Sequence, residues 1–251
     1  MGLNTSPNAA SGVNLLPFLA NYSNGFSTNL APDLLAKVAF EPGWGHFEIK
    51  ALGRFFRDRI ASTATTSDRT NTTGGYGVGF GALMPCVKKR FDVSVEGLLG
   101  QGIGRYGSSG LPDATLNPTT GELRPLREGR VMGGIVYHHN SRLDLYTYSG
   151  DEYAGRYGFV SPTGTAAGYG SPLASYGGCT NEVALNTCSG ANRNIYEATA
   201  GYWYRLYQGE YGRIEQGNQI LYIHRDLWSG VGRAPQGGDV VVYSTLRFYL
   251  P

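Results

Sequence analysis

Hydrophobic and polar residues alternate along most of this chain, with the period of two that separates the two faces of a β-strand. The C-terminal segment 240–251, VVVYSTLRFYLP, is one example. In HFEIKALGRFF, Phe47 and Ile49 fall on one face, while Glu48 and Lys50 fall on the other. A helix would scatter these two sets around its axis, so the pattern predicts strands.

The alternation starts near Asp33 and predicts nine strands, beginning near residues 34, 46, 76, 91, 130, 143, 194, 211 and 240. The links between them are alternately short and long. Short links are expected at 42–45, 87–90, 140–142 and 208–210, and long links at 61–73, 107–127, 161–193 and 229–239. The strand over 211–228 alternates less regularly, which predicts a β-bulge there.

Short turns at one end of a sheet and long loops at the other are typical of transmembrane β-barrels, with the short turns in the periplasm. We therefore predict an all-β fold: an antiparallel up-and-down transmembrane β-barrel, with about 9–10 strands in this chain. Residues 32–251 form it, and residues 1–31 are a partial strand, a plug or a linker. A soluble β-sandwich or propeller is the rival, but strands in soluble proteins average about 5–6 residues, and most of these are longer.

The odd number of predicted strands bears on the ends of the barrel. A complete bacterial barrel normally has an even number of strands and both chain ends in the periplasm. One ascending strand is therefore missing before Asp33. Either residues 10–28 supply it, or the chain is the C-terminal part of a larger barrel. The second reading is favoured, because the apolar patch at 13–19 alternates poorly and MGLNTSPNAASG is no export signal.

Composition supports a β protein and excludes several other classes. Charged residues make up 16% of the chain, against roughly 25% in soluble domains. The 38 glycines disfavour helices, since each costs about 1 kcal/mol inside one. The net charge of +2 predicts no nucleic-acid partner. No apolar run approaches the ~18 residues of a transmembrane helix.

Aromatic residues near the strand ends are candidates for the two girdles of a membrane barrel, because their rings favour the headgroup zone. The candidates near the short links are Trp44, Phe91, Phe248 and Tyr249. Those near the long links are Tyr76, Tyr106, Tyr196 and Trp228.

The three cysteines lie in two settings. Cys179 and Cys188 share one polar loop, GGCTNEVALNTCSG. We predict a disulfide that holds this exposed loop in an oxidising compartment, with two free thiols as the alternative. Cys86 stands near a turn and is predicted to be an inert, small apolar residue.

The terminal strand, the alternation of short and long links and the segment PGWGHFEIKALGRFFRDR resemble those of bacterial outer-membrane porins, over about residues 33–251. These motifs are generic for the class. The chain departs from it in ending LRFYLP, whereas such barrels usually end on Phe. The resemblance implies a place in the bacterial outer membrane, contact with the lipid bilayer and lipopolysaccharide, passage of small polar solutes or ions, and, as one option, a homotrimer.

Ionisable residues on the polar face are candidates to line a pore, where their charges would set selectivity. Arg54, with Arg57 and Arg59, is expected to favour anions. The same charges could instead pair and fill a small lumen, because an aqueous channel needs about 16 strands.

The main hypothesis is a passive diffusion channel, and the alternative is a non-transporting structural or adhesive barrel. The candidates are Lys37, Glu48, Lys50, Arg54, Asp92, Glu96, Arg130, Asp144, Glu197, Arg205 and Arg247.

Motifs of known enzymes are absent from the sequence, which has neither G-x-S-x-G nor H-E-x-x-H. His138 and His139 point to opposite faces of their strand and make a poor metal pair. We therefore expect no enzymatic activity, no metal and no cofactor. A hydrolase that assembles its residues from separate strands stays open.

Overall fold

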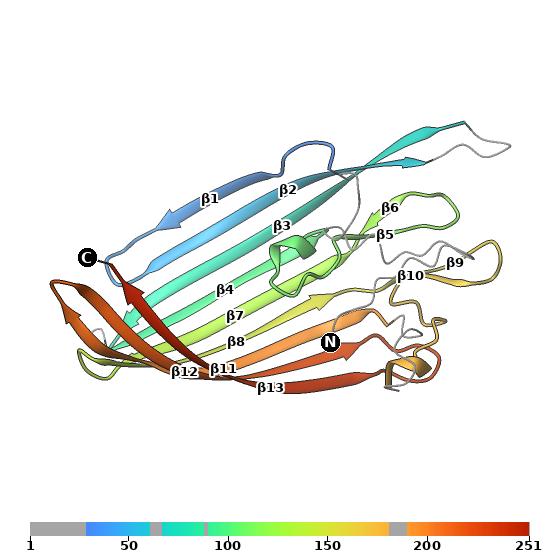
Figure 1. The fold of residues 1–251 in the computed structure, drawn as a ribbon. Helices are drawn as coiled ribbons and strands as arrows, with labels where there is room; N and C mark the ends of the chain where they lie inside the picture. The colour runs from blue at the N-terminus through green and yellow to red at the C-terminus, as the bar shows by residue number, and fades with distance from the viewer. Residues whose placement is uncertain (1–28, 61–66, 88–89, 181–189, 251) are drawn as a thin grey trace.

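A computed structural model describes residues 29–60, 67–87, 90–180 and 190–250, and Figure 1 shows the fold. Nine strands form one antiparallel sheet in the order β1-β2-β3-β4-β7-β8-β11-β12-β13. Their bounds are Leu34–Phe40 (β1), His46–Ile60 (β2), Arg69–Cys86 (β3), Phe91–Gln101 (β4), Arg127–His138 (β7), Leu143–Ala154 (β8), Asn192–Gly209 (β11), Gly212–Leu227 (β12) and Gln236–Tyr249 (β13). The predicted all-β, antiparallel up-and-down arrangement of nine strands is confirmed.

Several strand boundaries differ from the prediction. The β2–β3 hairpin is longer, since β2 continues to Ile60 and β3 already begins at Arg69. Two strands are shorter at the long-loop end: β4 stops at Gln101 and β8 at Ala154. A strand ends where its hydrogen bonds to the neighbouring strands end. The alternation of residues within one segment does not show where that is.

The long loops contain structure of their own. The β4–β7 loop, residues 102–126, holds a 3₁₀ turn, Gly104–Tyr106 (η2), and a small hairpin of Ala114–Leu116 (β5) and Leu123–Pro125 (β6). The β8–β11 loop holds the hairpin of Tyr157–Val160 (β9) and Ala166–Tyr169 (β10), and the 3₁₀ turn Gly177–Thr180 (η3). Figure 1 shows these loops at one end of the sheet and the short turns at the other.

The register of the sheet is irregular at β11. Pairing with β12 shifts between Asn192 and Asn194 and again between Arg205 and Tyr207. At each shift β11 has one residue more than β12, which defines a bulge on β11. The bulge predicted within 211–228 is therefore wrong: the extra residues lie on the partner strand β11, and β12 pairs with β13 without a shift.

One face of the sheet exposes large apolar side chains. Val38, Val78 and Val242 are 75%, 60% and 70% exposed, and they come from β1, β3 and β13. Contiguous apolar surface of this extent is not left in water by soluble monomers.

The buried core lies at the long-loop end of the opposite, polar face. Phe56 on β2 packs with Ala114 and Leu123 of the β4–β7 loop. A second cluster joins both long loops and contains Leu111, Leu126, Ala154, Tyr169 and Ala191. The inner face of β3 is lined with glycines, and a Cβ on Gly77 would lie 3.2 Å from Leu98 and 3.3 Å from Ile103. The absence of side chains there lets the loop lie close to the sheet.

The edges of the sheet are β1 and β13, and neither has a second neighbour among the described residues. Since nine antiparallel strands alternate in direction, β1 and β13 run the same way. Closure into a barrel stays a prediction, and the segment 1–28 lies outside the described residues. Within the described ranges, no helix is long and apolar enough to cross a membrane.

Candidate functional site

Strand register arranges the charges of the polar face in rows that run across the sheet. One row, called here the basic row, contains Lys37, Lys50, Arg130, Glu152 and Arg225. The next row toward the short turns, called the acidic row, contains Glu48, Glu96, Glu197 and Asp239. The rows are two residues, or roughly 7 Å, apart along the strands.

Arg54 fastens the β4–β7 loop to this face. Its Nη1 lies 2.6 Å from Oδ1 of Asp113 in the loop, and both side chains are 0% exposed. Its Nε donates to Asp33 at 3.1 Å, and Nη1 also donates to the carbonyl of Gly102. Arg105 adds a backbone N–H and its Nε to Asp113 at 2.8 and 3.1 Å. Arg54 therefore holds the loop and does not contact a lumen.

The predicted anion-attracting cluster of Arg54, Arg57 and Arg59 does not form. Positions of even number on β2 face the loop, and Phe56 and Asp58 are buried there beside Arg54. Arg57 and Arg59 have odd positions and point from the opposite face. The correction follows from strand geometry: neighbours two positions apart share a face, and those three apart do not.

A cavity of about 520 Å³ lies where the tip of the β4–β7 loop crosses the polar face. The tip is held by Glu152 on β8, whose Oε1 accepts the Ser108 N–H at 2.7 Å and the Ser108 hydroxyl at 2.9 Å. On the other side, the Tyr106 hydroxyl donates to Asp33 at 2.6 Å. The charged residues that line this loop cavity are Lys50, Glu96, Arg130, Asp151, Glu152 and Glu197.

Lys50, which lines the loop cavity, is joined to its neighbours by direct ion pairs. Glu48 lies 2.5 Å from Lys50 and 3.1 Å from Lys37. The contacts with both lysines connect the acidic and basic rows on β1 and β2. These three predicted pore-lining residues therefore form one compact group, with a charge of +1 in total.

A second group of ion pairs lies near the short turns. His138 approaches Asp92 at 3.1 Å and Asp144 at 2.8 Å, and Arg205 contacts Asp144 at 2.5 Å. Arg205 also lies 3.3 Å from Glu215. The predicted candidates Asp92, Asp144 and Arg205 thus meet across β4, β7, β8 and β11.

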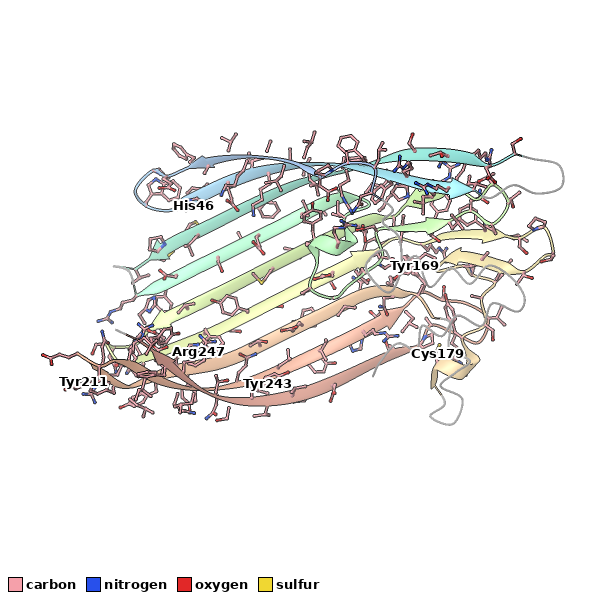
Figure 2. The ribbon with its side chains drawn as sticks, turned by 45° about the horizontal axis from the view of Figure 1, so that its top comes forward. His46, Tyr169, Cys179, Tyr211, Tyr243 and Arg247 are labelled. Atoms are coloured by element: carbon pink, nitrogen blue, oxygen red, sulfur yellow. The ribbon has the colours of Figure 1, made fainter. Side chains whose placement is uncertain are left out.

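Arg247, on the edge strand β13, lies near the short-turn end of the sheet (Figure 2). Its guanidinium lies over the ring of Trp203 at 3.8 Å. This stacking keeps the charge on the polar face and leaves its polar edge available to water.

Arg130, Glu96 and Glu197, which also line the loop cavity, form no direct ion pair among the described residues. Arg130 donates through Nη2 to the carbonyl of Ile103, but its buried Nε and Nη1 have no hydrogen-bond partner among the described residues. Among the described residues, Glu197 accepts one hydrogen bond, from the Thr199 hydroxyl at 3.3 Å. Glu96 is hydrogen-bonded to none of the described groups, and its interaction with Arg130 is through space.

The aromatic candidates divide between the two faces. Trp44, Tyr76 and Phe248 are well exposed, at 60%, 61% and 58%, and Phe91 stacks on Tyr137 with 4.7 Å between ring centroids. Tyr196 is also exposed, at 38%.

The other three aromatic candidates do not join an outer band. Tyr106 lines the loop cavity. Trp228 packs on the loop core and donates to the Ala154 carbonyl at 2.9 Å. Tyr249 pairs with Arg213 on the polar face, where the guanidinium lies 4.2 Å from its ring centroid.

The described residues include two of the three cysteines, Cys86 and Cys179. Cys86 is a free, half-buried thiol. Cys179 lies in η3 among the long loops (Figure 2). Cys188 lies outside the described residues, so the disulfide between them stays a prediction. In the described part of the chain, no group of three or more His, Cys, Asp or Glu residues could hold a metal ion.

Two residues of the site were missed in the sequence. Glu152 lies on the same face of its strand as Asp144, so extending the alternation along 143–154 would have found it. Asp113 lies in a loop without periodicity, and no local pattern connects it to Arg54, 59 positions earlier in the chain.

Tyr106 provides a test of the loop's position. Burial, and then its hydrogen bond to Asp33, raise the pKa of the Tyr106 hydroxyl to about 12, from about 10 in an unfolded chain. Its stabilising effect is therefore complete below pH ~10 and is lost as the pH rises toward ~12. Phenolate absorbance is titrated in the wild type and in Tyr106→Phe, and the difference between the two curves reports Tyr106. We expect this difference to be centred near pH 12. A difference centred near pH 10 would mean that the loop does not place the Tyr106 hydroxyl against Asp33.

No protein-family model and no curated protein matches the chain. Among solved structures, it is similar to the outer membrane channel DcaP of Acinetobacter baumannii, with 14% identity and a TM-score of 0.53 over 86% of this chain and 52% of that chain. It thus spans about half the length of the DcaP chain. The chain is also similar to the NanC porin over 87% of this chain and 93% of that chain, with 11% identity and a TM-score of 0.34. This TM-score is too low to support a structural conclusion. The chain therefore has a porin-like fold.

Proposed function

We propose that this chain lies in the bacterial outer membrane and forms a porin-like channel for the passive diffusion of small polar solutes or ions. The observation that carries the proposal is the contrast between its faces. One exposes apolar side chains from edge to edge, and the other holds charged rows and the loop cavity.

Each face then matches a different solvent. Exposed Val38, Val78 and Val242 are stable against lipid tails, where backbone groups are satisfied within the sheet. The opposite face, with its many ionisable groups, needs water. Lipid and lipopolysaccharide would surround the protein, and a homotrimer is one possible assembly.

The width of the pore depends on how the sheet closes. An aqueous channel needs about 16 strands, whereas the described sheet has nine. The proposal therefore includes further strands beside β1 and β13 that complete the wall. DcaP, which is described as an outer membrane channel and of which this chain covers 52%, is consistent with a wall of that size.

Conductance tests the proposal directly. The natural full-length protein, inserted into planar bilayers in potassium chloride, is expected to give discrete, ohmic conductance steps, because its polar face lines a water-filled path. Empty detergent micelles are the control. Folded protein that inserts but never conducts would contradict the channel.

A non-transporting structural or adhesive barrel is the second candidate. It is favoured by the common core of the two long loops, in which Leu111 and Leu126 pack with Tyr169 and Ala191. Such a core gives a stable surface at the outer end. Insertion without conductance would support this alternative.

A further inference from the structure

We propose that the apolar face of the sheet, over β8, β11, β12 and β13, contains a contact surface for a second copy of this chain. The proposal rests on the transmembrane arrangement proposed above, and it deepens that arrangement by locating the surface through which copies associate. The contact uses side chains that project from the sheet, so the edge of β13 remains available to further strands of the wall.

The apolar face, called outward here, changes its chemistry across the sheet. On β2 and β3 the outward positions carry no hydroxyl or amide apart from Tyr76 at the long-loop end, since the others are Phe47, Ile49, Ala51, Gly53, Phe55, Val78, Phe80, Ala82 and Met84. The register continues this face onto the other half of the sheet, where it includes Thr147, Ser149, Tyr202, Gln216, Asn218 and Ser244. Part of the face that would meet lipid is therefore polar.

Four of these polar residues are neighbours and are called here the polar patch: Tyr202, Gln216, Asn218 and Ser244. The register places Asn218 between Tyr202 on β11 and Ser244 on β13. The Tyr202 hydroxyl donates to Oε1 of Gln216 at 3.2 Å and accepts from Nδ2 of Asn218 at 2.7 Å. One hydroxyl thus connects the two amides on the outward face.

The polar patch lies halfway along the outward face of its strands. The outward positions of β12 are Ile214, Gln216, Asn218, Ile220 and Tyr222, and those of β13 are Val240, Val242, Ser244, Leu246 and Phe248. Asn218 and Ser244 are the central members of these two series. Because the apolar stretch of a transmembrane strand matches the hydrocarbon layer, both side chains would lie near the middle of the bilayer.

Lipid tails provide no hydrogen bonds to these amides. Among the described residues, the side-chain carbonyl of Asn218 accepts no hydrogen bond and the amide nitrogen of Gln216 donates none. Polar groups that face hydrocarbon without partners are costly, whereas a protein surface at the same depth can supply the partners. A protein contact therefore stabilises this part of the face more than lipid does.

A second copy of the chain has the chemistry that the polar patch requires. Side-chain amides are both donors and acceptors, so the amides of two copies related by a symmetry axis can satisfy each other. A copy inserted in the same direction also presents its amides at the same depth. Small side chains beside the patch allow the two sheets to approach closely, and these are Thr147, Ser149, Ala198 and Ala200.

Cross-linking of single cysteines tests where the copies meet. The natural full-length protein with Cys86→Ser and Ser244→Cys is reconstituted in pure form into lipid vesicles and treated with a bismaleimide. We expect a covalent dimer, because Ser244 lies in the contact. Ala51→Cys in the same background is the matched control, since Ala51 is the exposed central outward position of β2, and it should give only the background of the Cys86→Ser protein. No dimer at position 244, or equal dimer at both positions, would overturn the proposal.

The contribution of the amides is tested by self-association in vesicles. Energy transfer between labelled copies is followed as the ratio of lipid to protein increases. Asn218→Leu is expected to weaken association about tenfold, the ratio that corresponds to the loss of about one hydrogen bond, because leucine needs no partner in lipid. Gln208→Leu, which removes an exposed amide at the short-turn end of β11, is the control and should change nothing. Unchanged association of Asn218→Leu would reject the polar patch as the contact.

Bilayer recordings separate the contact surface from the channel itself. Conductance from protein that stays monomeric in vesicles would retain the channel and reject the contact surface. Cross-linking at position 244 without conductance would retain the contact surface and reject the channel. Protein that does not insert into vesicles would reject both.

Discussion

Replacing Asp113 by asparagine is expected to lower the free energy of unfolding by about 3 kcal/mol and to loosen the β4–β7 loop. Breaking a fully buried ion pair costs about 3–5 kcal/mol, because the remaining charge loses its partner. Arg54 and Asp113 are both 0% exposed and lie 2.6 Å apart. The lower end of the range applies because Asp33 still contacts Arg54 at 3.1 Å.

The measurement is reversible urea unfolding in lipid vesicles, with limited proteolysis of the loop as a second readout. Glu122→Gln is the matched control, since it removes an exposed ion pair with Arg124 from the same loop. Exposed pairs contribute less than about 1 kcal/mol. Equal stability of the two variants would show that Asp113 does not anchor the loop.

The loop's position also makes Asp113→Asn a test of the pore. The loop crosses the polar face at the cavity, where Ser108 contacts Glu152. If this crossing narrows the path of ions, the variant should conduct more than the wild type. Unchanged conductance in a destabilised variant would place the narrowest point elsewhere, for example at the His138 group near the short turns.

The strands were predictable because their signal is local. Side chains two positions apart share a face, and in β2 the series from Phe47 to Phe55 repeats this rule over a long stretch. The alternation of link lengths then gave the direction of each strand. Strand ends were misplaced, as at Arg69, where a polar segment continues the pairing of β3 without an apolar face, and the bulge was expected on β12 although the extra residues lie on β11.

The partner of each charged side chain was less predictable, because ion pairs form between segments that are distant in the sequence. Alternation places Arg54, Arg130 and Asp144 on one face, and the register confirms this placement. It does not reveal that Arg54 meets a loop residue, or that Asp144 meets His138 and Arg205. Sequence therefore predicts the polar face, whereas only the folded chain shows which of its charges form structural ion pairs.

The two faces can be compared directly by placing an arginine at each of two adjacent positions of β7. Ile135 is on the apolar face and is 44% exposed. Val136 is on the polar face, where it pairs with Asp92 and Tyr146. In a bilayer, Ile135→Arg is expected to lower the free energy of unfolding by about 1–2 kcal/mol, because the cost of a cation facing lipid falls from about 2–4 kcal/mol at the midplane to about 0–1 kcal/mol at the interfaces, and Ile135 lies three residues from the short-turn end of β7.

Val136→Arg is the matched control, and its arginine would face water and the carboxylate of Asp92. We expect a change below about 1 kcal/mol for this variant, because a partly hydrated ion pair offsets the lost apolar contacts. Both variants are measured by the same reversible unfolding in vesicles. In detergent micelles the difference should shrink, since their interface admits water to the side chain. Equal costs at the two positions in vesicles would mean that β7 does not separate lipid from water, and the transmembrane arrangement of the sheet would have to be abandoned.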